Sequence, residues 1–138
     1  MQVPKPSTFR FALDLHSGVP VYRQIIDQVM GGIAASSLSP GDQLPTVRQL
    51  AVDLAINPNT VIRAYRELEL LGVLDTQQGT GTFIARQKTP RSSAERARRL
   101  AQITQEFAAR CGAEGFSLED VIEALEDLRP ESTKKRRT

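Results

Sequence analysis

The feature that most limits the possible folds is a pair of short helical patterns separated by three residues. In TVRQLAVDLA, which starts at Thr46, apolar residues recur at the i, i+3, i+4, i+7 spacing of one helix face. The linker Ala55-Ile56-Asn57 leads into Pro58, which suits a first helical turn because it lacks a backbone N–H. The second pattern then runs to Gly72, a typical residue after a helix end. Two helices joined by so short a turn are typical of a helix-turn-helix.

The segments on either side complete a winged helix-turn-helix. VPVYRQIIDQVMGGIAASSL, from residue 19, has an apolar residue at every fourth position and predicts a preceding helix. After Gly72, VLDTQQ and TFIAR are two extended pieces around Gly79-Thr80-Gly81, which predicts a hairpin with a glycine-rich tip. The predicted fold class is mainly α with a small β-hairpin, followed by a two-helix C-terminal segment.

The C-terminal segment is predicted to mediate dimerisation. Helical patterns cover 94–111 and 118–128, and Ser117 with Asp120 forms the capping-box pattern of the second. Each apolar stripe is too short to build a core alone, so we expect the two helices to pair with a second copy across a two-fold axis. The residues expected in that contact are Leu100, Phe107, Leu118, Val121, Ile122 and Leu125.

Composition sets the remaining limits. The 138 residues carry a net charge of only +2, so a polyanionic partner must be met by a local arrangement of charges. One cysteine, Cys111, and the lack of an apolar run of membrane or signal-peptide length lead us to expect a cytoplasmic protein. The expected organisation is a flexible N-terminus (1–12), a winged helix-turn-helix (13–88), a helical dimerisation segment (89–129) and a basic disordered tail (130–138).

The outer face of the second motif helix carries the chemistry of nucleic-acid recognition. At 100° per residue, Asn59, Arg63 and Arg66 point away from the apolar face, with Thr60 and Ile62 on the flanks. Arginine binds guanine edges or phosphates, asparagine binds adenine, and threonine binds either group. The helix N-terminus adds backbone donors and a positive dipole end that favour a phosphate.

The same sequence allows functions other than DNA recognition. The polar face could be merely solvated, or the winged helix could contact protein or RNA, in which case an apolar outer face would be expected. Catalysis is disfavoured because no nucleophile–base pair or phosphate loop is present, and a single histidine with a single cysteine argues against a metal site. Tyr65 is expected to be structural, His16 incidental, and Cys111 a small apolar residue, with redox sensing as the alternative for the cysteine.

Four motifs in order make residues 20–85 resemble the DNA-binding domain of GntR-family bacterial transcription regulators. They are PVYRQI, LSPGDQLPTVRQLA, NTVIRAYRELELLGVL and GTGTFIA. NPNTV with RAY, and the short two-helix tail, further resemble the YtrA subfamily. The resemblance implies a homodimeric repressor that binds an inverted-repeat operator in double-stranded DNA, often near genes for an ABC-type transporter. It implies no cofactor, and the sequence identifies no small-molecule effector.

The resemblance also implies particular DNA contacts. Family contact positions fall on Thr46, Arg48, Asn57, Asn59, Thr60, Gln78 and Gly79. The sequence departs from many members by having Pro58 and Ile62 where they have arginine, so Arg63 is expected to take over a base contact while Ile62 packs on a thymine methyl. The hairpin tip lacks the basic residues often found there and is expected to contribute less to binding than is usual in the family. With the outer-face residues, the candidates are Thr46, Arg48, Asn57, Asn59, Thr60, Ile62, Arg63, Arg66, Gln78, Gly79 and Thr80.

Overall fold

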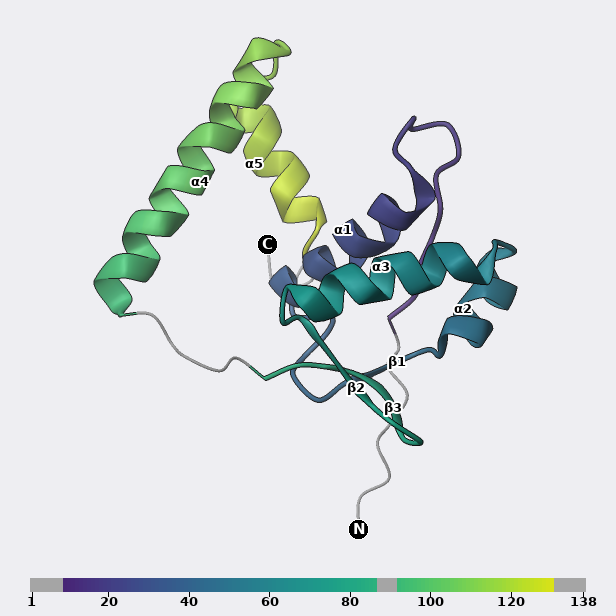
Figure 1. Ribbon diagram of the computed structural model, residues 1–138. Helices are drawn as coiled ribbons and strands as arrows, with labels where there is room; N and C mark the ends of the chain where they lie inside the picture. The colour runs from purple at the N-terminus through teal and green to yellow at the C-terminus, as the bar shows by residue number, and fades with distance from the viewer. Residues whose placement is uncertain (1–8, 87–91, 131–138) are drawn as a thin grey trace. The chain divides into compact units, whose positions relative to one another are not determined.

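The computed structural model describes residues 9–86 and 92–130, and the chain divides into two compact units, residues 1–87 and 88–138 (Figure 1). Three sequence-based expectations lie outside the described residues: the flexibility of residues 1–8, the unit boundary at residue 88, and the basic tail from residue 131 onward.

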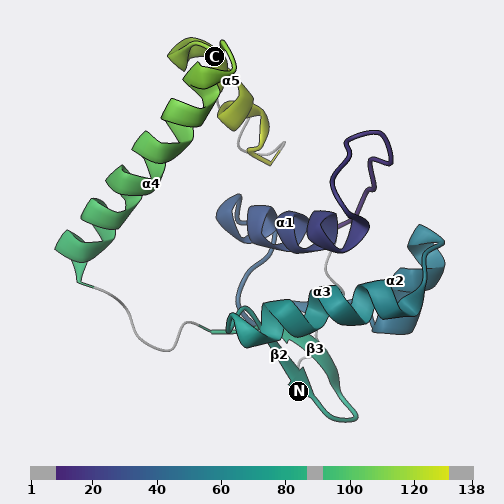
Figure 2. The same cartoon turned by 45° about the horizontal axis from the view of Figure 1, so that its top comes forward.

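The first unit is a winged helix-turn-helix, as the sequence predicts. Figure 2 shows α1 lying alongside α3, with the β2–β3 hairpin projecting from the helices. The strand order is β1-β3-β2 and both pairings are antiparallel. The elements are α1 (Val21–Ala34), β1 (Gln43–Leu44), α2 (Val47–Leu54), α3 (Pro58–Leu70), β2 (Leu74–Gln77) and β3 (Gly81–Ile84).

The core of this unit lies where α1, α2 and the sheet meet α3. The α3 side chains predicted to be apolar-facing are all buried, and they pack with residues of α1, α2, β2 and β3. Those α3 residues are Val61, Ala64, Tyr65 and Leu68. Because these side chains are buried along the length of α3, the helix cannot rotate about its axis. Its opposite face therefore points away from the core and is open to a partner.

Residues 9–14 form an extended strap on α1, bonded to side chains of that helix. Gln28 donates from its side-chain amide to the carbonyl of Ala12 and accepts from the Ala12 N–H. Gln24, one turn earlier and buried, makes the same pair of bonds to the backbone of Asp14. Two glutamines four residues apart thus bond to the backbone N–H and C=O groups of alternate residues in an extended chain, much as a neighbouring strand would.

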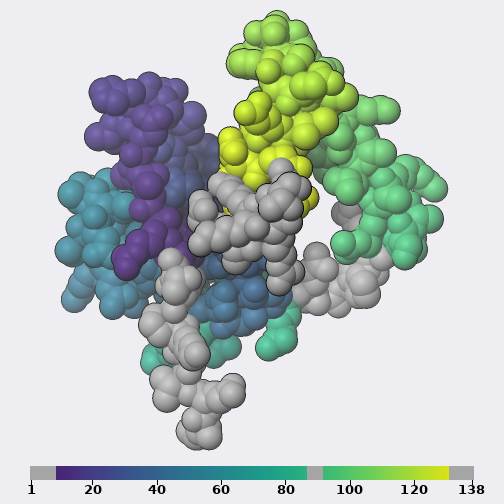
Figure 3. All heavy atoms as spheres, turned by 180° about the vertical axis from the view of Figure 1, so that it is seen from behind, coloured from purple at the N-terminus to yellow at the C-terminus, as the bar shows by residue number. Residues whose placement is uncertain are grey.

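The strap also explains a glycine inside α1. A Cβ at Gly32 would lie 2.8 Å from the Cε2 atom of Phe9 and 3.0 Å from a methyl carbon of Leu38. Phe9 and Phe11 pack edge to face, with ring centroids 5.0 Å apart, and both contact the core. Figure 3 shows the strap in purple on the surface of the first unit. The position therefore favours glycine for close approach, despite the lower helix propensity of glycine.

The second unit is a pair of helices, α4 (Ser93–Ala113) and α5 (Leu118–Asp127). The predicted Ser117–Asp120 capping box is present in both directions. The helix extends beyond the predicted pattern of 94–111, because α4 continues through Gly112 to Ala113 and the chain reverses only at Gly115, whose φ is +90°. Among the described residues, neither these helices nor any other is long and apolar enough to cross a membrane.

Tyr65 ties the helix-turn-helix together, and its replacement by phenylalanine should destabilise the fold. The buried hydroxyl donates to the carbonyl of Pro45, which precedes α2, at 2.8 Å. We expect Tyr65→Phe to lower the free energy of unfolding by about 1 kcal/mol in denaturant titrations at neutral pH, because the carbonyl loses its partner. An unchanged midpoint would mean that this hydrogen bond is not stabilising.

The same residue should make stability sensitive to alkaline pH. Burial raises the pKa of Tyr65 above its ordinary value of 10.0 by disfavouring the phenolate. The tyrosine contribution is therefore complete below the unfolded-state pKa of about 10 and is lost as pH rises beyond it. Tyr65→Phe should lose less stability than the wild type over that alkaline range.

Candidate nucleic-acid interface

The start of α3 is an exposed, capped tip. Asn57 is the N-cap, with its side-chain Oδ1 accepting from the Asn59 N–H at 2.8 Å, and Pro58 occupies the first turn. One backbone donor that sequence reasoning left free for a phosphate is therefore already used by the protein. Asn57 and Asn59 are exposed, while Thr60 is half-buried. The tip thus presents amide groups with both donor and acceptor capacity.

The start of α2 carries a second polar group. Thr46 and Gln49 form a reciprocal capping box, in which the Thr46 hydroxyl accepts from the Gln49 N–H at 3.1 Å. The hydroxyl proton is not used by that bond, so it can be donated to a phosphate oxygen. Arg48, two residues after Thr46, is exposed on α2 and forms no ion pair within the described residues.

The outer face of α3 is the third group, and it gathers the predicted side chains on one surface. Ile62, Arg63 and Arg66 are exposed together with Asn59, on the side opposite the core residues of the helix. Neither of the two ion pairs found among the described residues involves the outer face of α3. Two uncompensated guanidinium groups and an amide at the start of a helix are suited to bind a polyanion.

Arg63 is held by an aromatic ring that sequence reasoning did not connect with it. Its Cζ lies 3.7 Å from the centroid of the Tyr22 ring, in the first turn of α1. Tyr22 is half-buried and packs against the core cluster. The signal in the sequence was only the PVYRQI motif, and nothing in its spacing relates it to the middle of α3.

The tip of the β2–β3 hairpin is the fourth group, and β1 supports it. Gln78, Gly79 and Thr80 are exposed. The Gln43 side-chain amide reaches from β1 to the Thr80 carbonyl at 3.3 Å. Gly81 has a φ of +141°, a backbone conformation that favours glycine, and a Cβ there would lie 2.5 Å from the same Gln43 nitrogen, so the Gln43 side chain would have to move. The tip carries no cation, as the sequence predicts.

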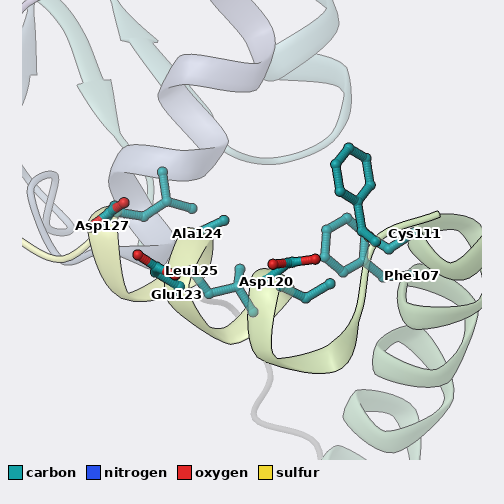
Figure 4. A pocket seen from close by; sticks show the side chains of 10 residues that line it. Phe107, Cys111, Asp120, Glu123, Ala124, Leu125 and Asp127 are labelled. Carbon is teal, nitrogen blue, oxygen red and sulfur yellow. The ribbon is translucent and has the colours of Figure 1, made fainter. Parts of the chain in front are cut away.

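The second unit presents an uncovered apolar surface. No residue of α4 is buried, and α5 buries only Val121, which is 9% exposed. The other residues of α4 and α5 that are predicted to form the dimer contact are all exposed, including Ile122 and Leu125 at 49% each. Phe107 and Cys111 from α4 line a hollow of about 640 Å³ together with residues of α5, among them Asp120 and Leu125. Figure 4 shows the labelled Asp120 side chain of α5 beside Phe107. Exposed apolar area of this kind marks a contact surface.

Comparison with known proteins assigns the first unit to a family. The model described as "Bacterial regulatory proteins, gntR family" matches residues 21–84, from the first residue of α1 to the last of β3. YtrA from Sulfolobus acidocaldarius, a GntR-family transcription factor of known structure, is 31% identical with a TM-score of 0.52. That match covers 97% of the archaeal chain and 70% of this one. The chain belongs to the GntR family.

Curated GntR relatives are similar over the same region. The HTH-type transcriptional regulator YhcF of Bacillus subtilis is 48% identical over 69 residues, which are 50% of this chain and 57% of YhcF. The HTH-type transcriptional repressor YtrA of the same organism is 45% identical over 73 residues, 53% of this chain and 56% of the repressor. The matched region thus spans a little over half of each relative. The resemblance to the GntR family and its YtrA-like members is confirmed, and these relatives are transcriptional regulators, not enzymes.

Proposed function

We propose that this protein is a homodimeric transcriptional repressor that binds an inverted-repeat operator in double-stranded DNA, with α3 in the major groove. The observation that carries the proposal is the capped, exposed α3 tip continued by Arg63 and Arg66 on a helix whose other face is buried. A helix held in this way by a short turn can enter a groove and present its first turns to base edges. Repression in the Bacillus relative named YtrA is consistent with this role.

Two copies are needed because one winged helix reads only half of an inverted repeat. The exposed apolar surface of α4 and α5 is suited to pair with the same surface on a second copy, which would satisfy a helix pair that buries almost nothing alone. A two-fold dimer would place two α3 helices about one DNA turn apart. Control of an ABC-type transporter operon is part of the same proposal and rests only on family resemblance.

The direct test is selection of bound sequences from a random duplex pool by the full chain, followed by footprinting of its own upstream region. We expect an enriched inverted repeat and protection of two half-sites spaced by about one helical turn. Recovery of sequences without symmetry would contradict the dimeric operator. Equal affinity for the enriched and unrelated duplexes would remove the proposal of a sequence-specific regulator.

Arg48 should contribute to backbone contact instead of base reading. It lies in the first turn of α2, where a phosphate is the nearer target. We expect Arg48→Ala to weaken binding to operator and unrelated DNA alike, and to lower the slope of log affinity against log salt by about 1 unit. Titrations at several salt concentrations measure this slope. A slope equal to that of the wild type would exclude the phosphate contact.

A further inference from the structure

The contact between Arg63 and Tyr22 has a defined geometry. Arg63 Cζ lies over the Tyr22 ring at 3.7 Å from the ring centroid, and so short a distance favours a stacked guanidinium over an edge-on approach. The ring itself has little freedom, because Tyr22 is half-buried and α1 packs against α3 with Ile25 and Ile26 in the core. The Tyr22 ring is therefore a rigid aromatic surface in contact with Arg63 on the outer face of α3.

Stacking through the face leaves the guanidinium edge available. The N–H donors of arginine lie in the plane of the group, and the bidentate contact with guanine O6 and N7 uses that edge. Arg63 forms no ion pair with a carboxylate in residues 9–86 and 92–130, and Glu67, one turn further along α3, is not bonded to it. No carboxylate of the described residues therefore occupies its donors.

The other two arginines of the candidate interface differ in this respect. Arg48 and Arg66 are exposed, and within the described part of the chain neither lies over an aromatic ring. A free arginine side chain loses rotamer freedom when it binds, which weakens the contact it makes. An arginine already extended along a ring has lost much of that freedom before the partner arrives.

We propose that Tyr22 is a positioning residue for base reading: its ring holds Arg63 extended toward DNA and so strengthens the preference at the base pair that Arg63 contacts. This rests on the proposed DNA-binding function and deepens it. Tyr22 acts through Arg63, so its effect should be confined to one base pair in each half-site and should vanish when Arg63 is absent.

The test is a double-mutant cycle on the full chain. The wild type first selects its operator, and Arg63→Ala identifies the base pair whose replacement no longer affects affinity. Dissociation constants are then measured for the wild type, Tyr22→Leu and Tyr22→Phe on the operator, on the operator altered at that base pair, and on an unrelated duplex. The same Tyr22 changes are repeated in the Arg63→Ala background, which isolates their coupling.

We expect Tyr22→Leu to reduce the preference at that base pair by about 3- to 10-fold, the size of a cation–π contact. Affinity for the unrelated duplex should not change. Tyr22→Phe keeps the ring and should retain the preference, and neither change should add to Arg63→Ala. If Tyr22→Leu fails to fold, as thermal unfolding would show, Tyr22→Met replaces it, because methionine fills a similar volume without a ring.

Three results would overturn the positioning role. They are an equal loss of affinity on all duplexes, the same loss in the Arg63→Ala background, and an unchanged preference in Tyr22→Leu when the wild type does select an operator. In each of these, sequence-specific binding by the wild type still stands. If the wild type selects no sequence, the proposed function fails as well, so the two failures are distinguishable.

Discussion

A full-length variant with Ile122→Asp and Leu125→Asp should sediment as a monomer at micromolar concentration and lose operator affinity by about 10²- to 10⁴-fold. Each side chain is 49% exposed on the apolar surface of α5, where a second copy is proposed to bind. A carboxylate there would be desolvated on dimerisation without a partner charge, which is costly. The affinity falls because the second half-site is no longer bound by a tethered α3.

The control is Leu15→Asp, which places one new carboxylate on an exposed leucine of the first unit. Leu15 is 76% exposed, so the control should stay folded and dimeric and bind as the wild type does. Analytical ultracentrifugation and operator titration report the two properties separately. A double variant that still dimerises would exclude this surface as the dimer contact, and a ligand-binding or regulatory role for α4 and α5 would then be favoured.

Local chemistry made much of the fold predictable. The caps at Thr46, Asn57 and Ser117 are formed by side chains two or three residues from the groups they bind, so the sequence pattern contains the whole interaction. The buried face of α3 follows from helical periodicity in the same way, since side chains of one face must share one environment. The candidate DNA-contact residues on α3 were found because they occupy the opposite face.

Contacts between distant segments were not predictable by the same reasoning. The extended piece at Gln43–Leu44 becomes β1 only because it pairs with Phe83 and Thr82 of β3. The strap on α1 depends on glutamine side chains bonded to a backbone 10 and 16 residues away. A glutamine on a helix is usually solvated, so neither residue signals such a role locally.

The candidate site shows the same division. Arg63 was identified from its direction on α3, but its support comes from another helix. The Gln43 amide beneath the hairpin tip likewise comes from a strand that is remote in the sequence. Side chains that can contact a partner were therefore predictable, whereas those that position them were not.

Arg63→Ala should weaken operator binding by about 1–3 kcal/mol and relax the preference at one base pair in each half-site. Arg63 is exposed, has no ion pair among the described residues, and has its Cζ over the Tyr22 ring at 3.7 Å from the centroid. Loss of a bidentate base contact should affect the operator much more than unrelated DNA, because only the operator presents the matching edge. Titration of a panel of operators with single base-pair changes measures both effects.

A charge-matched control separates base reading from simple attraction to a polyanion. Arg98→Ala removes the same charge from an exposed position of α4, outside the winged helix, and should leave base preference intact. If Arg63→Ala weakens operator and unrelated duplexes equally, Arg63 contacts only phosphate, which is read without regard to sequence. Specificity would then have to come from Asn59, Ile62 and Arg66, and the contact of Arg63 with the Tyr22 ring would contribute only to affinity.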